Sequence, residues 1–230
     1  MIGRIEASDD AEALARHVAE WLIGQVDRHA GPVRIALSGG STPRRMFALL
    51  ASPAYAGRMD WAKLHLFWGD ERCVPYDSPD SNYGEAKRLL LDHVGIPAGQ
   101  VHPFDVRLPP EAAADAYAAN LTRDAGAGML FAITFLGLGE DGHTASLLPG
   151  QAVLDERHRL AAAVTEGRPE TRLTLTFPAL ERSEIVAFLV SGAGKQVIFR
   201  DIRAGLADVP AARLRPLGET VWFVDQSALG

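Results

Sequence analysis

The chain has 230 residues, of which 47% are hydrophobic and 23% are charged, an ordinary composition for a globular protein. These proportions exclude collagen-like and disordered classes, and the single cysteine, Cys73, excludes an intrachain disulfide scaffold. The net charge of −6 gives no electrostatic reason to expect nucleic-acid binding, and it argues weakly against an anionic membrane surface.

Two stretches of the chain bear on its cellular location. Residues 1–10 show no positively charged segment followed by an apolar one, so no signal peptide is expected. The apolar run 129–136 is far shorter than the roughly 20 residues that a membrane-spanning helix needs. The lone cysteine fits a reducing compartment. We therefore expect a soluble cytoplasmic protein.

The first half of the chain alternates helical patterns with short strand patterns. Ser8 or Asp9 is expected to cap a first helix, whose apolar residues recur at three- and four-residue steps. Thr42 as N-cap and Pro43 at the first helical position begin a second helix, which ends near Leu50. The other elements predicted in this half are strands over Val33–Leu37 and Leu64–Trp68, and helices over 83–91 and 110–125.

The second half continues the alternation. Residues 130–136 are apolar throughout, which is typical of a strand covered on both faces. Further strands are predicted over 160–164, 173–177, 185–190 and 221–224, with a helix over 195–204. The alternation predicts a three-layer, Rossmann-like α/β fold whose mostly parallel sheet carries helices on both faces. No repeat or linker interrupts it, so we expect one domain over residues 1–230, with ligands beyond the carboxyl ends of the strands.

The segment 38–43, Ser-Gly-Gly-Ser-Thr-Pro, lies between a predicted strand and the next helix. Its glycines allow a tight turn, and the helix start points free N–H groups and its positive dipole end at the same place. This arrangement favours a phosphate, although the segment matches neither a P-loop nor the dinucleotide fingerprint. The alternative is an ordinary tight turn with a good helix cap. The candidate phosphate-binding residues are Ser38, Gly39, Gly40, Ser41 and Thr42.

Two acids and an arginine, Asp70, Glu71 and Arg72, closely follow the second predicted strand. At the carboxyl end of a strand they could serve the hydroxyls and the phosphate of a sugar. The alternative is a solvated charge cluster. Further on, Ser81 and Asn82 can be explained simply as helix caps. Together the two segments suggest a polar sugar site that includes Asp70, Arg72 and Asn82.

The segment 137–146, Gly-Leu-Gly-Glu-Asp-Gly-His-Thr-Ala-Ser, follows the apolar strand and contains Asp141 and His143. A free histidine has a pKa of about 6.5, so a neutral imidazole can take a proton from water near neutral pH. A neighbouring carboxylate would orient the ring and stabilise the imidazolium as it forms. We therefore predict catalytic roles for both residues. The alternative is a histidine that only hydrogen-bonds a loop, which is our interpretation of the other six histidines.

Two basic residues later in the chain are candidates to hold an anion. Arg172 precedes a predicted strand, and Lys195 follows the glycine-rich segment 191–194 that leaves another strand. A lysine at a helix start opposes the helix dipole unless an anion lies nearby; the alternative is a solvated lysine. Asp141 and His143 alone are too few ligands for a catalytic zinc, so no metal site is predicted. The sequence also has no Gly-x-Ser-x-Gly elbow to supply a serine nucleophile.

With these motifs in place, the chain resembles the 6-phosphogluconolactonase family over nearly its whole length, in the order and the spacing of the motifs. One departure is Glu181, which stands where the family often has an asparagine. It puts little in doubt, because the other motifs are intact. The segments that carry the resemblance are 38–43, 68–72, 80–83, 137–147, 172–176 and 192–195.

The resemblance implies hydrolysis of 6-phospho-D-glucono-1,5-lactone to 6-phosphogluconate, the second step of the oxidative pentose phosphate pathway, with no metal or organic cofactor. It implies that His143 is the general base and that Asp141 helps to orient it. Lys195, Arg72, Arg172 and the segment 38–42 would hold the phosphate and the ring oxygens. The expected partner is the small-molecule lactone alone, with no nucleic acid and no membrane. The sequence does not indicate an oligomeric state.

Two rival functions differ from lactone hydrolysis in testable ways. Aldose–ketose isomerases and glucosamine-6-phosphate deaminases resemble the lactonases in fold, but they assist the histidine with a glutamate five residues further on. That position here is Leu148, which can neither orient nor polarise a histidine. A non-catalytic sugar-phosphate sensor would need the phosphate loop and Lys195, but it has no need of both Asp141 and His143.

Overall fold

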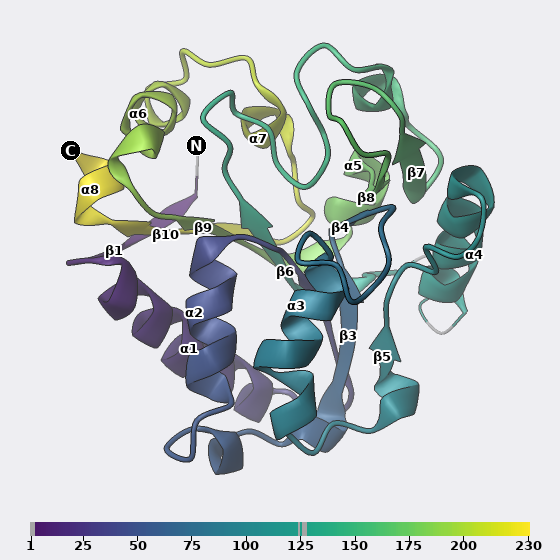
Figure 1. The fold of residues 1–230 in the computed structure, drawn as a ribbon. Coiled ribbons are helices and arrows are strands. Elements are labelled where there is room, and N and C mark those ends of the chain that lie inside the picture. The colour runs from purple at the N-terminus through teal and green to yellow at the C-terminus, as the bar shows by residue number, and fades with distance from the viewer. Residues whose placement is uncertain (1–2, 124, 126–127) are drawn as a thin grey trace.

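The computed structural model describes residues 3–123, 125 and 128–230 (Figure 1). Its main sheet has the strand order β1-β10-β9-β6-β2-β3-β5, and its neighbouring strands pair in parallel. These strands are β1 (Arg4–Ser8), β2 (Val33–Leu37), β3 (Leu64–Trp68), β5 (Val101–His102), β6 (Phe131–Gly137), β9 (Ser183–Val190) and β10 (Glu219–Asp225). The predicted α/β fold with a mostly parallel sheet is confirmed.

A smaller antiparallel sheet stands beside the carboxyl ends of the main one, in the order β4-β8-β7. Its strands are β4 (Asp70–Arg72), β7 (Ala161–Val164) and β8 (Arg172–Leu175). The sequence predicted the last two strands approximately, but not that they leave the main sheet. The expected strand 173–177 was too long, because Phe177 already begins a short helix that has a proline in its first turn.

Helices cover both faces of the main sheet, as two adjacent residues of β10 demonstrate. Successive side chains of a strand point to opposite faces. Phe223 packs against Trp21 with ring centroids 5.1 Å apart, and Trp222 packs against Phe199 at 5.5 Å. Trp21 belongs to α1 (Ala11–Arg28) and Phe199 to α6 (Gln196–Arg203), so these helices lie on opposite faces. The three layers expected from the sequence are therefore present.

The remaining helices complete the two outer layers. In Figure 1, α2 lies between α1 and α3, and α4 stands next to the small sheet. Their bounds are α2 (Ser41–Leu50), α3 (Asn82–Leu89), α4 (Pro110–Thr122), α5 (Phe177–Leu180), α7 (Pro210–Arg213) and α8 (Gln226–Leu229). The helix expected over 110–125 thus ends earlier, and position 124 of that prediction lies outside the described residues.

Two of the predicted helix caps were wrong, and one was right. Asp10, not Ser8 or Asp9, caps α1, because parallel pairing with β10 keeps the backbone extended as far as Ser8. Gly40, not Thr42, is the N-cap of α2, which places Pro43 third in the helix, where its missing N–H still costs no intrahelical bond. Ser81 caps α3 as expected, since its hydroxyl accepts from the Gly84 N–H at 2.9 Å.

The order of the strands determines where a ligand can bind. From β2 the chain proceeds to β3 and β5 on one side, whereas from β6 it proceeds to β9 and β10 on the other. The connections therefore diverge between β2 and β6, which lie side by side. In open parallel sheets the ligand crevice forms at this switch point, beyond the carboxyl ends of the strands. The loops that leave β2 and β6 are the glycine-rich segments 38–43 and 137–146.

Candidate active site

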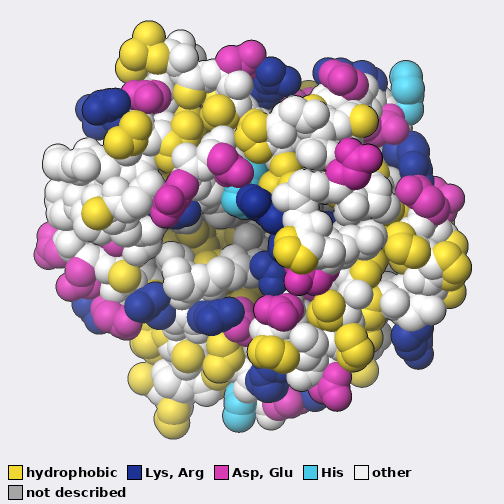
Figure 2. Space-filling model, turned by 45° about the horizontal axis from the view of Figure 1, so that its top comes forward, with side chains coloured by type: hydrophobic (Ala, Val, Ile, Leu, Met, Phe, Trp, Pro, Cys, Tyr) yellow, Lys and Arg dark blue, Asp and Glu magenta, His cyan; other side chains and the backbone are white. Residues whose placement is uncertain are grey.

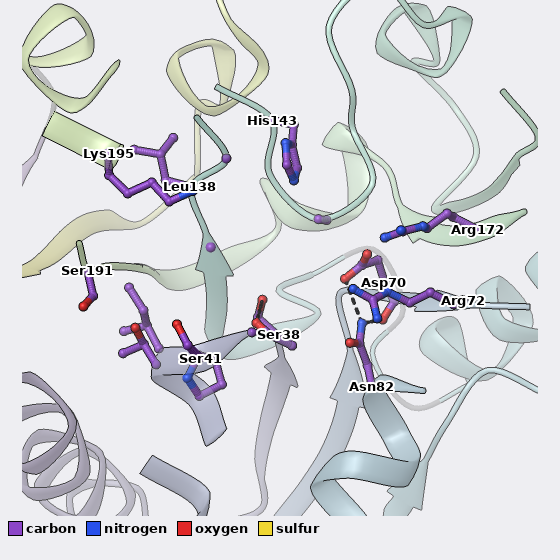
Figure 3. A pocket seen from close by; sticks show the side chains of 18 residues that line it. Ser38, Ser41, Asp70, Arg72, Asn82, Leu138, His143, Arg172, Ser191 and Lys195 are labelled. Carbon is purple, nitrogen blue, oxygen red and sulfur yellow. Dashed lines mark hydrogen bonds between the residues drawn. The ribbon is translucent and has the colours of Figure 1, made fainter. Parts of the chain in front are cut away.

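A pocket of about 250 Å3 lies at this edge of the sheet (Figure 3). Figure 2 shows a hollow on the same face, with Lys and Arg side chains along its rim. The pocket brings together the ten predicted binding residues and His143, whereas Asp141 stands behind His143 rather than in the lining. Leu189, which sequence reasoning did not single out, also lines it. So do residues that belong to the predicted motifs without an assigned binding role, namely Pro43, Gly137, Leu138, Gly139, Ala145 and Ser191.

The floor of the pocket at the end of β2 is the start of α2. Gly40 has φ +106°, a conformation that favours glycine, and it turns the chain directly into the helix. As N-cap it makes no side-chain hydrogen bond to the helix, so the first N–H groups of α2 keep their donor capacity. With the positive end of the helix dipole, these donors make the start of α2 suited to an anion.

Asp70 and Glu71, the two acids after β3, make different contacts. Asp70 is buried in the pocket lining and accepts from the Ser146 hydroxyl at 2.7 Å and from Asn82 Nδ2 at 3.3 Å. Glu71 points away from the pocket and accepts the backbone N–H groups of Asn82 and Tyr83, each at 2.8 Å. Burial raises the pKa of Glu71, although these hydrogen bonds oppose the shift. Glu71 therefore anchors the start of α3, which in turn holds Asn82 beside Asp70.

Arg72 and Arg172 place two positive charges side by side. They are opposite residues of the antiparallel pair β4 and β8, and both line the pocket. Among the described residues neither buried Nε finds a hydrogen-bond partner. Burial lowers the pKa of the Arg172 guanidinium, and the charge of Arg72 lowers it further. Adjacent like charges with unused buried donors indicate a place for an anion.

The His143 ring is held by the loop that follows β6. Its Nδ1 lies 2.5 Å from Asp141 Oδ1, and the same oxygen accepts the His143 backbone N–H at 3.1 Å. Because a carboxylate only accepts hydrogen bonds, Nδ1 carries the hydrogen and Nε2 is left as an acceptor. The imidazole points into the pocket between Lys195 and Arg172 (Figure 3). A base that can take a proton thus stands between the Lys195 amine on one side and the two arginines on the other.

Neighbouring groups stabilise the ionised carboxylate form of Asp141. Partial burial acts to raise the pKa of this carboxyl, but the backbone and ring hydrogen bonds of His143 outweigh it. The charges of His143 and Arg168 act in the same direction, so the pKa lies below its ordinary value. Arg168 Nη2 lies 3.3 Å from Asp141 Oδ2. No sequence motif pointed to Arg168, since it comes from a loop remote in the chain.

Lys195 reaches the pocket from the turn after β9. It ends a short 3-10 helix, Ala193–Lys195, that precedes α6, and its backbone N–H donates to the Gly192 carbonyl at 2.9 Å. In the part of the chain that the structure describes, its side-chain amine has no hydrogen-bond partner or ion pair. Asp225 holds the turn in place by accepting from the Ser191 hydroxyl at 2.5 Å and from the Gly192 N–H at 3.1 Å. The half-buried Lys195 amine therefore lines the pocket on a turn that Asp225 holds in place.

Comparison with known proteins places the chain among sugar-phosphate enzymes. Residues 8–222 match the family model described as glucosamine-6-phosphate isomerases/6-phosphogluconolactonase. The chain belongs to this family. The resemblance found in the sequence motifs is therefore confirmed, and the matched residues include every segment that forms the pocket.

The relatives within this family agree with that assignment. The chain is 42% identical over 207 residues to a 6-phosphogluconolactonase of Synechocystis sp., covering 86% of this chain and 84% of the relative. It is 36% identical to a 6-phosphogluconolactonase of Mycobacterium tuberculosis, covering 99% and 98%. The solved structure of 6-phosphogluconolactonase from Trypanosoma cruzi superposes with a TM-score of 0.86 at 28% identity, covering 98% of this chain and 95% of that one.

Over residues 3–123, 125 and 128–230, no group of three or more His, Cys, Asp or Glu side chains is arranged to hold a metal ion. In the same part of the chain, no helix combines the length and the apolar character needed to span a membrane.

Proposed function

We propose that the chain hydrolyses 6-phospho-D-glucono-1,5-lactone to 6-phosphogluconate, the second step of the oxidative pentose phosphate pathway. One observation carries this proposal: the Asp141–His143 pair points into a pocket that has cationic groups on both sides. The product of lactone hydrolysis carries a phosphate at one end and a carboxylate at the other. A pocket with two separated anion sites and a base between them suits such a product.

The proposed reaction begins when His143 Nε2 takes a proton from a water molecule that attacks the lactone carbonyl carbon. Asp141 keeps the other nitrogen protonated and stabilises the imidazolium that forms. The tetrahedral intermediate then collapses, the bond from the carbonyl carbon to the ring oxygen breaks, and the imidazolium returns the proton to that oxygen. One water is consumed, the new carboxylic acid releases its proton to solvent as 6-phosphogluconate forms, and His143 ends as it began.

We infer that the two anion sites bind different ends of the substrate. The start of α2 and Lys195 offer backbone N–H groups, hydroxyls and a point charge, which suit the three oxygens of a phosphate. Arg72 and Arg172 offer planar guanidinium groups with unused donors, which suit a carbonyl that becomes an oxyanion and then a carboxylate. We therefore assign the phosphate to the first group and the reacting carbonyl to the second.

Leu148 argues against the other activity of the family. The deaminase-type reaction needs a carboxylate at this position to act on the histidine, and here a buried leucine side chain occupies it. Leucine has no group that ionises or hydrogen-bonds, so it gives His143 no such support. This favours proton transfer from water over ring opening of an amino sugar.

The proposal is tested by following the loss of freshly generated 6-phosphogluconolactone, with its spontaneous hydrolysis subtracted. The wild-type protein should accelerate the reaction, and it should act much more weakly on unphosphorylated gluconolactone, which lacks the group for Lys195. A wild-type rate equal to the background would contradict the proposed function. Equal efficiency on both lactones would contradict the assigned phosphate site.

Gly139→Ala is expected to damage the site without unfolding the protein. A Cβ at this position would lie 2.0 Å from His143 Nδ1 and 2.6 Å from Asp141 Oδ1, so both side chains must move. We expect kcat to fall by about tenfold or more, the scale of a misplaced catalytic group. Gly95→Ala, where the added methyl meets nothing within 4 Å, is the matched control. Equal kcat values for the two variants would contradict the close packing described.

A further inference from the structure

Asp141 uses its two carboxylate oxygens for different partners. Oδ1 accepts from His143, whereas Oδ2 accepts from Nη2 of Arg168 at 3.3 Å. Arg168 lies between β7 and β8, so it reaches the loop after β6 from a separate part of the chain. The carboxylate is thus held from both sides, by the ring it orients and by a cation behind it.

We propose that Arg168 is a positioning residue, which fixes the Asp141 carboxylate so that this group holds the His143 imidazole in its working orientation. The kinetic part of this inference rests on the proposed lactone hydrolysis. Neither Arg168 nor Asp141 is among the described residues that line the pocket. Arg168 therefore acts on the reaction through Asp141 and not by touching the substrate.

The Asp141 side chain needs such a support. It is 45% exposed, so packing alone does not fix it, and the terminal torsion of an aspartate has a broad rotational well. Rotation of the carboxylate would turn Oδ1 away from Nδ1 and release the ring. An ion pair on Oδ2 opposes this rotation, because turning the carboxylate would also move Oδ2 away from the guanidinium.

The backbone that carries Arg168 is anchored on the wall of the pocket. Thr171, three residues later, accepts the Cys73 N–H at 2.9 Å, and the next residue, Arg172, is the ladder partner of Arg72. The antiparallel pair that aligns the two pocket arginines therefore also fixes the end of the segment that bears Arg168. The β4–β8 pairing therefore supports both the Arg72–Arg172 site and, through Arg168 and Asp141, the His143 base.

The charge of Arg168 also affects which protonation state of the base is favoured. Asp141 contacts His143 directly, and across the pocket lie Lys195, Arg72, Arg172 and Asp70. Without Arg168, His143 would face a carboxylate whose charge is less compensated, which favours the imidazolium. A general base must be neutral to accept a proton, so the acidic limb of the pH–rate profile should move to higher pH.

Arg168→Ala should therefore lower kcat by about two- to fivefold, the scale of an exposed ion pair expressed as a rate. KM should change by less than about twofold, since the substrate loses no contact. The acidic limb of the profile should shift upward, and Arg168→Lys should restore part of kcat. In an Asp141→Asn background, Arg168→Ala should lower kcat no further, because the carboxylate through which Arg168 acts is already absent.

The control is Arg159→Ala, which removes an ion pair of similar exposure, with Glu111 and Asp115, and should leave kcat and the pH profile unchanged. A raised KM, or a further loss in the Asp141→Asn background, would show that Arg168 contacts the substrate and would overturn the proposal. Unchanged kcat and pH profile in Arg168→Ala would overturn it as well.

A measurement without turnover separates this inference from the proposed function. In the ligand-free protein, NMR of the His143 ring should show faster solvent exchange of the Nδ1 hydrogen in Arg168→Ala than in wild type or Arg159→Ala. Equal exchange in the three proteins would overturn the positioning role. This result is interpretable even if the wild type proves inactive on the lactone, an outcome that would count against the proposed function alone.

Discussion

His143→Ala is expected to lower the catalysed rate of lactone hydrolysis by roughly 10²-fold or more, the usual scale for loss of a general base. KM should change little, because phosphate and carbonyl contacts are assigned to other residues. The His143 side chain is 30% exposed, so its removal leaves no buried cavity and the fold should persist. The rate is measured with freshly generated lactone after subtraction of the spontaneous reaction.

The matched control for this variant is His158→Ala, which alters an exposed histidine away from the pocket and should retain the wild-type rate. Equal thermal unfolding of both variants would show that any loss is chemical. An intact rate in His143→Ala would remove His143 from the mechanism. It would also leave the short contact with Asp141 without a catalytic explanation.

Lys195→Ala is expected to raise KM by roughly 10- to 100-fold, which corresponds to losing a hydrogen bond to a charged group. Its amine has no partner among the described residues, so the phosphate is its one assigned contact. We expect kcat to change much less, because the phosphate lies away from the reacting carbonyl. The measurement is the full dependence of rate on lactone concentration.

Unphosphorylated gluconolactone provides the control for this second variant. If Lys195 binds the phosphate, its replacement should leave the weak reaction of this substrate unchanged. Lys87→Ala, which removes an exposed lysine paired with Asp92, should affect neither substrate. Unchanged KM and kcat in Lys195→Ala, or an equal loss with both lactones, would remove Lys195 from the phosphate site.

The sequence was sufficient to predict five of the seven strands described in the main sheet, and the loops of the pocket. Apolar runs such as residues 130–136 identify strands that are covered on both faces, and the glycine-rich motifs follow them directly. Because the carboxyl ends of parallel strands meet at one edge, loops far apart in the chain had to converge. The sequence therefore predicts that His143, Lys195 and the segment 38–42 lie close together.

Other features depend on contacts that no local pattern records. β5 has two residues, and β1 is an edge strand whose sequence, Arg-Ile-Glu-Ala-Ser, contains no continuous apolar run, so local composition predicts neither strand. The pairing of Arg72 with Arg172 requires a separate antiparallel sheet. Glu71 looked like a second sugar ligand, but its hydrogen bonds turn it toward the start of α3. Arg168 is identified as a candidate only by the 3.3 Å contact of its Nη2 with Asp141 Oδ2, because no local motif marks it.

The two activities named in the family provide the most direct test of the central claim, that this pocket hydrolyses a phosphorylated lactone. Wild-type protein should be assayed in parallel for loss of 6-phosphogluconolactone and for release of ammonia from glucosamine-6-phosphate. We predict lactone hydrolysis well above the spontaneous rate and no enzyme-dependent ammonia. Ammonia release together with a lactone rate at background would contradict both the role of Leu148 and the proposed function.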